Sequence, residues 1–215
     1  MLVCKLSNPS RKGMIAVYAR VPGEPMAKVA TLDGETILRL KIAPGITWDD
    51  ALAARAGALG ARAACLRDAT RIAGARLVSR KRLLDRLKRK GHDAALSEEI
   101  TEILVRNGVV NDEQLARVVA SATANSKRGK RAIEQKLRTR GVDAKLAKSA
   151  AAAAAATRDA LADATDMARA RASRLPAKLD ILARRRRLLA LLIRRGHDYE
   201  TAERAVRAVL REATE

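Results

Sequence analysis

Residues 79–91 read SRKRLLDRLKRKG and predict a short helix with one apolar stripe and a strongly cationic remainder. Leu83 and Leu87 are four residues apart, so they share one face of a helix. Ser79 is an N-cap candidate, because its hydroxyl can accept a hydrogen bond from an unpaired first-turn amide. Gly91 can adopt the left-handed conformation that ends a helix. A helix this short is marginal in water by itself, so we expect partner helices around it.

The same pattern occurs twice more. The final glycine recurs as Gly141, 50 residues after Gly91, and as Gly196, a further 55 residues along the chain. An aliphatic pair stands four and eight residues before each glycine, and an aspartate that can cap a following helix stands two residues after it. A fixed internal period with one helix-turn-helix in each copy is typical of a repeat protein. The three-helix repeats that we expect cover residues 61–110, 111–160 and 161–215.

The residues before the repeats, 1–60, predict a small antiparallel β-unit and a linking helix. The first 13 residues read as a polar lead-in, and stretches rich in strand formers follow it. Pro22-Gly23 predicts a turn, and Asp33-Gly34 is a hairpin signal. The three strands that we expect cover residues 14–20, 26–32 and 35–42.

The linking helix is expected to begin with Thr47 as its cap and to be interrupted by Gly57 and Gly60. A further helix over residues 61–75 then opens the first repeat. Trp48 is the single tryptophan of the chain. We interpret it as a plug between the β-unit and the helices rather than as a base-stacking residue.

Two helices of the second repeat have their own signals. Asn111-Asp112 predicts a helix start. Residues 145–161 contain seven consecutive alanines and predict one long helix. The residues expected on the packed face of the helix after Asn111 are Leu115, Val118, Val119 and Ala122.

The fold class expected from these patterns is mainly α: an elongated array of three tandem three-helix repeats, preceded by a small N-terminal antiparallel β-unit. Phenylalanine is absent and aromatic residues make up 1% of the chain. Alanine, leucine, isoleucine and valine must therefore fill the core. Such a core buries little area per residue, so we expect modest stability and an extended shape.

The net charge of the chain is +20, and it is unevenly distributed. Residues 1–60 hold eight Lys and Arg and five Asp and Glu, which leaves a net charge of +17 for residues 61–215. A genome biased toward alanine and arginine explains the preference for Arg over Lys, but it does not explain the excess of bases over acids. A basic helical region of this size favours a polyanionic partner, nucleic acid or nucleoprotein.

The basic residues that cluster beside each motif glycine are the candidate contacts. Contacts to phosphate give little sequence specificity and weaken steeply with salt. Any one of these side chains can equally belong to a solvated helix face, but the clustering favours the group as a site. Four consecutive arginines span the circumference of a helix, so those at 184–187 cannot all face one way. The candidates are Arg80, Lys81, Arg86, Lys88, Arg89, Lys127, Arg128, Lys130, Arg131, Arg184, Arg185, Arg186, Arg187, Arg194 and Arg195.

The sequence offers little for catalysis. Cys4 and Cys65 have no metal-ligand spacing, and two lone cysteines suggest a reducing compartment. His92 and His197 follow glycines at equivalent repeat positions, which favours packing over acid–base work. No phosphate-binding glycine loop, signal peptide or membrane span is visible. We expect a cytoplasmic protein that is not an enzyme and that needs no cofactor or metal.

Together with the three-fold recurrence, four local strings resemble the RecX family. The resemblance covers about residues 62–211. The strings are RLKRKGHD at 86–93, GVVNDE at 108–113, KRGK at 127–130 and RRGH at 194–197.

The sequence also departs from the family pattern. The family usually has an aromatic residue after the repeat glycine, and here His92, Val142 and His197 stand there. Residues 114–116 read QLA where the family usually has Arg-Phe-Ala. The last helix of the second repeat is nearly all alanine.

The resemblance implies a regulator of the RecA recombinase, active in DNA recombination, repair and the SOS response, and we expect the protein to be a monomer. Such proteins bind within the groove of the RecA filament, curb its recombinase, ATPase and co-protease activities, and bind single- and double-stranded DNA weakly and without sequence preference. Two other classes compete with this reading. A sequence-nonspecific basic DNA-binding or architectural protein would need no recombinase. An amphipathic membrane-surface protein is disfavoured, because the motif helices lack aromatics and their apolar stripe is needed for the core.

Overall fold

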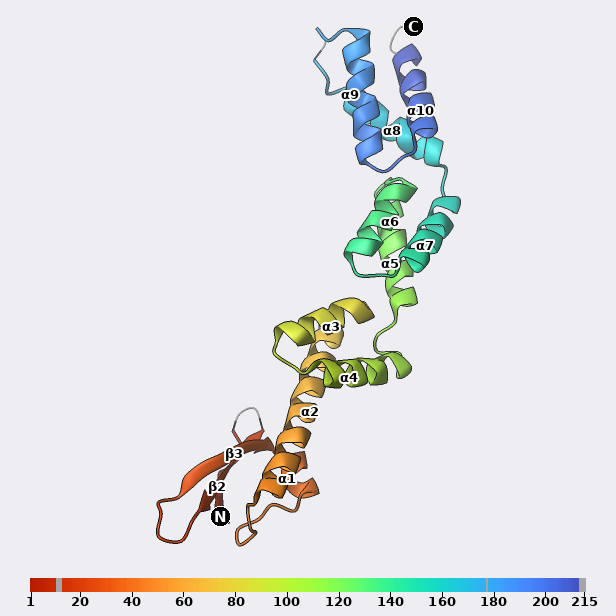
Figure 1. The fold of residues 1–215 in the computed structure, drawn as a ribbon. Helices are drawn as coiled ribbons and strands as arrows, with labels where there is room; N and C mark the ends of the chain where they lie inside the picture. Colours follow the sequence, from red (N-terminus) through yellow and green to blue (C-terminus); the bar gives the residue numbers. More distant parts are fainter. Residues whose placement is uncertain (11–12, 177, 213–215) are drawn as a thin grey trace. The chain divides into compact units, whose positions relative to one another are not determined.

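The computed structural model describes residues 1–10, 13–176 and 178–212. A three-stranded antiparallel sheet opens the chain and helices follow it (Figure 1), which confirms the mainly α fold class with a small N-terminal β-unit. The chain divides into two compact units. The first unit is Met1–Ala75 with Leu84–Leu104, and the second is Arg76–Leu83 with Val105–Glu215.

The sheet of the first unit has the strand order β1-β2-β3. The predicted polar lead-in is wrong, because β1 pairs with β2 and buries Val3, which is 1% exposed. The two other strands agree with the prediction to within one residue. The strands are β1 (Leu2–Leu6), β2 (Met14–Arg20) and β3 (Ala27–Asp33).

The predicted third strand over 35–42 is also wrong, because α1 (Gly34–Arg39) lies there. Asp33 is the N-cap of this helix, and its Oδ1 accepts a hydrogen bond from the Thr36 amide at 2.9 Å. The Asp-Gly pair therefore starts a helix instead of closing a hairpin. Ile37 of this helix is buried in the core against the sheet.

One helix of 26 residues, α2 (Asp50–Ala75), replaces the two helices predicted between 47 and 75. Its first turn is capped by Asp49, which accepts a hydrogen bond from the Leu52 amide at 2.7 Å, so the predicted cap at Thr47 is wrong. The predicted interruption by two glycines is wrong as well. Gly60 faces the sheet, where a Cβ would come within 3.4 Å of Leu32.

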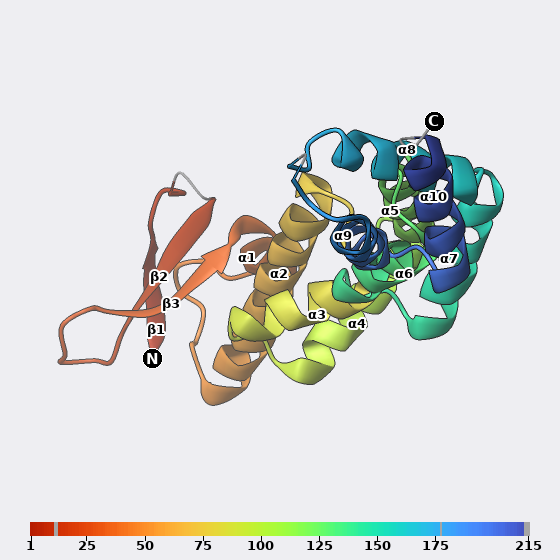
Figure 2. The ribbon, with the colours of Figure 1, turned by 90° about the horizontal axis from the view of Figure 1, so that it is seen from above.

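Trp48 is 5% exposed and belongs to the core between the sheet and the helices. Val17 of β2 and Ala56 of α2 belong to the same cluster. Figure 2 shows α1 and α2 on one side of the sheet. The interpretation of Trp48 as a packing residue is confirmed.

A polar cluster fastens the turn after α3 (Arg80–Arg89) to α2 in the first unit. His92 Nε2 lies 3.0 Å from Asp68 Oδ2, and the other Asp68 oxygen pairs with Arg71 at 2.7 Å and Lys90 at 3.2 Å. The hydrogen bond from His92, followed by that from Arg71, holds the pKa of Asp68 well below its usual range. The turn leads into α4 (Ala94–Arg106).

We expect Asp68→Asn to lower the free energy of unfolding by about 1 kcal/mol at pH 6. The folded-state pKa lies below the unfolded value, so the carboxylate stabilises the fold above the unfolded pKa and loses this effect as pH falls through the folded pKa. Urea unfolding at pH 6 and at about pH 2.5 checks this. The difference in free energy of unfolding between wild type and variant should be smaller at the acid pH. Asp85→Asn, at an exposed position, should have the same stability as the wild type at both pH values. An equal gap at both pH values would contradict the role given to Asp68.

The second unit contains two three-helix bundles (Figure 1). The first bundle packs around Leu115, Ile133 and Leu137, and the second around Leu188, Leu192 and Val206. The helices of the first bundle are α5 (Asp112–Ala124), α6 (Lys130–Thr139) and α7 (Ala144–Ala156), and those of the second are α8 (Ala160–Ala172), α9 (Ile181–Arg194) and α10 (Tyr199–Glu212).

The packed face of α5 differs from the prediction. Leu115 and Val119 are buried as expected, but Val118 is 50% exposed and Ala122 is exposed as well. Ala116 and Ala120, each one position after a buried residue, are buried in their place. Small side chains thus shift the buried stripe, because they let the neighbouring helices approach more closely.

The single helix predicted over 145–161 is interrupted. α7 ends at Ala156, and Asp159 caps α8 by accepting hydrogen bonds from the amides of Leu161 and Ala162, both at 2.9 Å. The helix that contains the alanine run therefore ends before a second, separately capped helix begins. Across the described residues, no helix is long and apolar enough to cross a membrane.

Candidate anion-binding interface

The three motif helices α3, α6 and α9 share one design. All six aliphatic residues of the motif pairs are 0% exposed, and most of the basic residues around them on the three helices are exposed. Gly91, Gly141 and Gly196 have φ values of +84°, +84° and +91°, so each ends its helix in the left-handed conformation. The aspartates two residues further on cap the next helices, as predicted.

Within the second unit, the start of α6 is joined to the end of α9. The Gly129 amide donates to the Arg195 carbonyl oxygen at 3.0 Å, and the Arg131 amide donates to the Gly196 carbonyl oxygen at 3.2 Å. These bonds satisfy carbonyl groups that have no partner inside their own helix. His197, 3% exposed, places Nε2 3.1 Å from the Lys127 carbonyl oxygen, which supports the packing role expected for it.

The start of α3 meets the end of α6 in the same manner. Ser79 Oγ donates to the Arg140 carbonyl oxygen at 2.8 Å, and Arg82 Nη2 donates to the Thr139 carbonyl oxygen at 2.7 Å. Ser79 Oγ also accepts from the Arg82 amide at 3.2 Å, which confirms it as the N-cap. Two successive junctions therefore use the same ends of the motif helices.

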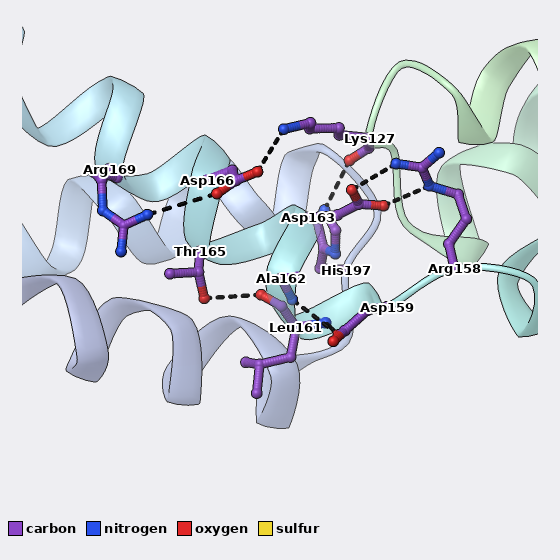
Figure 3. Close-up of polar contacts among 10 residues, drawn as sticks. All are labelled: Lys127, Arg158, Asp159, Leu161, Ala162, Asp163, Thr165, Asp166, Arg169 and His197. Carbon is purple, nitrogen blue, oxygen red and sulfur yellow. Dashed lines mark hydrogen bonds and ion pairs between the residues drawn. The ribbon is translucent and has the colours of Figure 1, made fainter.

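Ion pairs surround the junction of α6 and α9 (Figure 3). Arg158 donates two hydrogen bonds of 2.7 Å to Asp163, and Lys127 Nζ lies 2.6 Å from Asp166. The hydrogen bond from Arg158 lowers the pKa of Asp163, and that from Lys127 lowers the pKa of Asp166. Lys127 was a candidate contact, but its charge is already paired within the chain.

A cavity of about 230 Å³ lies at this junction. Four cationic residues line it together with several alanines. Of its two acids, Asp163 is held by Arg158, and Asp198 caps α10 by accepting from the Thr201 amide at 2.8 Å. The amides of Gly129 and Arg131 at the start of α6 already donate to carbonyl groups at the end of α9, so the positive charge of the cavity comes from its side chains. The cationic residues of the lining are Arg128, Lys130, Arg131 and Arg158.

Three of the predicted contacts, Arg128, Lys130 and Arg131, are thus brought together. Arg158 was missed, because nothing in its local sequence indicates that it lies beside them. Such a site can hold an anion: the cations supply charge and donors, and the alanines leave room for the ligand. No group of acidic, histidine and cysteine side chains suited to a metal occurs in the part of the chain that the structure describes.

The other predicted contacts are dispersed. The four arginines that begin at Arg184 diverge as expected: the first is half-buried, the second pairs with Glu203 at 2.7 Å, and the last two are exposed. On α3, the residue Arg86 is half-buried. The remaining exposed candidates are Arg80, Lys81, Lys88, Arg89 and Arg194, and Arg195 is half-buried at its junction.

These observations define a class of protein: basic three-helix repeats joined through the ends of one motif helix, preceded in the chain by a small antiparallel sheet. Solved structures share this fold. A crystal structure of regulatory protein RecX aligns over 94% of this chain and 97% of its own, with a TM-score of 0.65 and 16% identity. A RecX from Lactobacillus salivarius covers 69% of this chain and 96% of its own, with a TM-score of 0.61 and 18% identity.

Sequence comparison gives the family. The profile of the RecX second three-helix domain matches residues 111–150. The regulatory protein RecX of Mycobacterium avium is 33% identical over 153 residues, which cover 70% of this chain and 84% of that protein. The match to the regulatory protein RecX of Mycobacteroides abscessus, 40% identical over 83 residues, covers 38% of this chain and 41% of that protein's length. The chain belongs to the RecX family, a family of regulatory proteins and not a known family of enzymes.

Proposed function

We propose that this protein regulates the RecA recombinase: it binds the RecA nucleoprotein filament in the cytoplasm and restrains the recombinase, ATPase and co-protease activities during recombination and repair. The observation that carries the proposal is one basic motif helix, present three times in a member of the RecX family. A filament repeats its own surface, so a protein that repeats a binding element is suited to it.

The proposed mechanism is multivalent. Each repeat contributes a modest basic surface, and joining the repeats in one chain raises the avidity for a periodic target. Arg128, Lys130 and Arg131, with the cavity beside them, are the proposed phosphate contacts. The exposed basic residues of α3 and α9 are proposed to add further contacts to DNA or to acidic recombinase surface.

The test is the ATP hydrolysis of the cognate RecA on single-stranded DNA. We expect this protein to suppress hydrolysis by at least half at about one molecule per ten recombinase subunits, because one molecule contacts several subunits. An unchanged rate at equimolar protein would contradict the proposal.

The second candidate is a sequence-nonspecific DNA-binding protein. The net charge of +17 on residues 61–215 favours it. It predicts salt-sensitive binding to bare DNA and no effect on ATP hydrolysis when DNA is in excess over both proteins. The two candidates are therefore separated by repeating the ATPase titration at several DNA concentrations.

A further inference from the structure

A second surface, distinct from the anion-binding cavity, lies between α9 and α10. It is a groove of about 290 Å³, which we name the α9–α10 groove. Two large aliphatic side chains in the first turn of α9 stand open to solvent here: Ile181 is 58% exposed and Leu182 is 63% exposed. The full lining is Ile181, Leu182, Arg185, Glu203, Arg207, Leu210 and Arg211.

The charge around this groove is positive. Among the described lining residues Glu203 is the one acid, and it is paired with the arginines: Arg185 lies 2.7 Å and Arg207 3.7 Å from the same carboxylate oxygen. Arg211 adds a third cation. The arginines thus outnumber the acid three to one and leave a positive border around the aliphatic residues.

This chemistry suits a protein better than a nucleic acid. Single-stranded nucleic acid is held by aromatic stacking platforms, and the described lining contains no aromatic residue. Apolar anchors surrounded by arginines are typical of protein interfaces, where arginine is enriched and aliphatic contacts exclude water. The anion-binding cavity differs, because its apolar lining is mainly alanine.

We propose that the α9–α10 groove docks an acidic protein segment that inserts aliphatic side chains against Ile181 and Leu182 and pairs its carboxylates with the arginine rim. The assignment of this segment to the recombinase rests on the proposed function. The two surfaces then divide the work: the anion-binding cavity contacts phosphate, and the α9–α10 groove contacts protein.

The experiment compares Ile181→Ser/Leu182→Ser with the wild type in two binding assays, one on RecA filaments assembled on single-stranded DNA and one on the same DNA alone. We expect at least about tenfold weaker binding to filaments. Binding to DNA alone should stay within about twofold, because no phosphate contact is removed. Val118→Ser is the matched control, since it removes a half-exposed aliphatic residue of α5 outside the groove.

Circular dichroism verifies that the variants are folded. Should the serine variant unfold, Arg207→Glu/Arg211→Glu tests the same groove through its charge, with the same expected loss on filaments. Wild-type affinity of a folded groove variant for filaments would overturn the proposal, as would an equal loss on bare DNA. If the wild type bound filaments no better than bare DNA, the proposed function itself would fail, and the assignment to the recombinase with it.

Discussion

Gly196→Ala is expected to lower the free energy of unfolding by about 3 kcal/mol or more. Two costs combine at this position. A φ of +91° places an L side chain in the left-handed region. The added Cβ would also collide with the backbone nitrogen of Ala132 and approach the Ala132 Cβ to 2.5 Å, so α6 would have to move away from α9. Urea unfolding followed by circular dichroism measures the loss.

Gly91→Ala is the matched control. This glycine holds the same position in the first motif, with a φ of +84°, but a Cβ there meets nothing within 4 Å. Alanine should therefore cost only the conformational strain, about 1–2 kcal/mol. Equal losses for the two variants would mean that the collision with Ala132 adds no cost to the backbone strain.

Arg128→Glu/Lys130→Glu/Arg131→Glu is expected to weaken binding to single-stranded DNA about 100-fold at low salt. These residues line the proposed anion-binding cavity together, so their reversal turns a positive site negative. Losing three phosphate contacts should also reduce the slope of log affinity against log salt by about 2. Fluorescence anisotropy with a labelled oligonucleotide over a salt series measures both quantities.

Lys5→Glu/Arg20→Glu/Lys28→Glu changes the net charge by the same amount. These residues are exposed on the three strands and lie outside every basic cluster described above. We expect this variant to bind with most of the wild-type affinity and salt slope. A loss as large as that of the cavity variant would show that net charge, and not the cavity, determines the affinity.

The motif helices could be predicted because their signals are local. The buried pair Leu83 and Leu87 follows from helical periodicity, and the glycine and aspartate after it act through backbone geometry within a few residues. Local stretches of strand-forming residues likewise predicted β2 and most of β3. Repetition strengthened the prediction, since three copies agree.

Other features depend on contacts that the local sequence does not encode. Asp33-Gly34 is suited both to a hairpin turn and to a helix start. In the structure it starts a helix, and Ile37 of that helix packs in the core against the sheet. Likewise, the ion pair of Lys127 with Asp166 joins residues 39 positions apart, and no local pattern predicts it. Arg158 stands between α7 and α8, and only the packing of these helices brings it to the cavity.

The N-cap residue of a motif helix also decides whether the start of that helix can meet the carbonyl end of another. At each internal junction the N-cap suits a neighbouring carbonyl group: Ser79 donates to one, and Gly129 has no side chain to obstruct one. At the start of α9 the N-cap is Asp180, which accepts from the Ala183 amide at 2.6 Å. A carboxylate only accepts hydrogen bonds, so it would repel the carbonyl end of any further motif helix. Replacing Asp180 with serine or glycine would therefore make the start of α9 resemble the two helix starts that meet a carbonyl group.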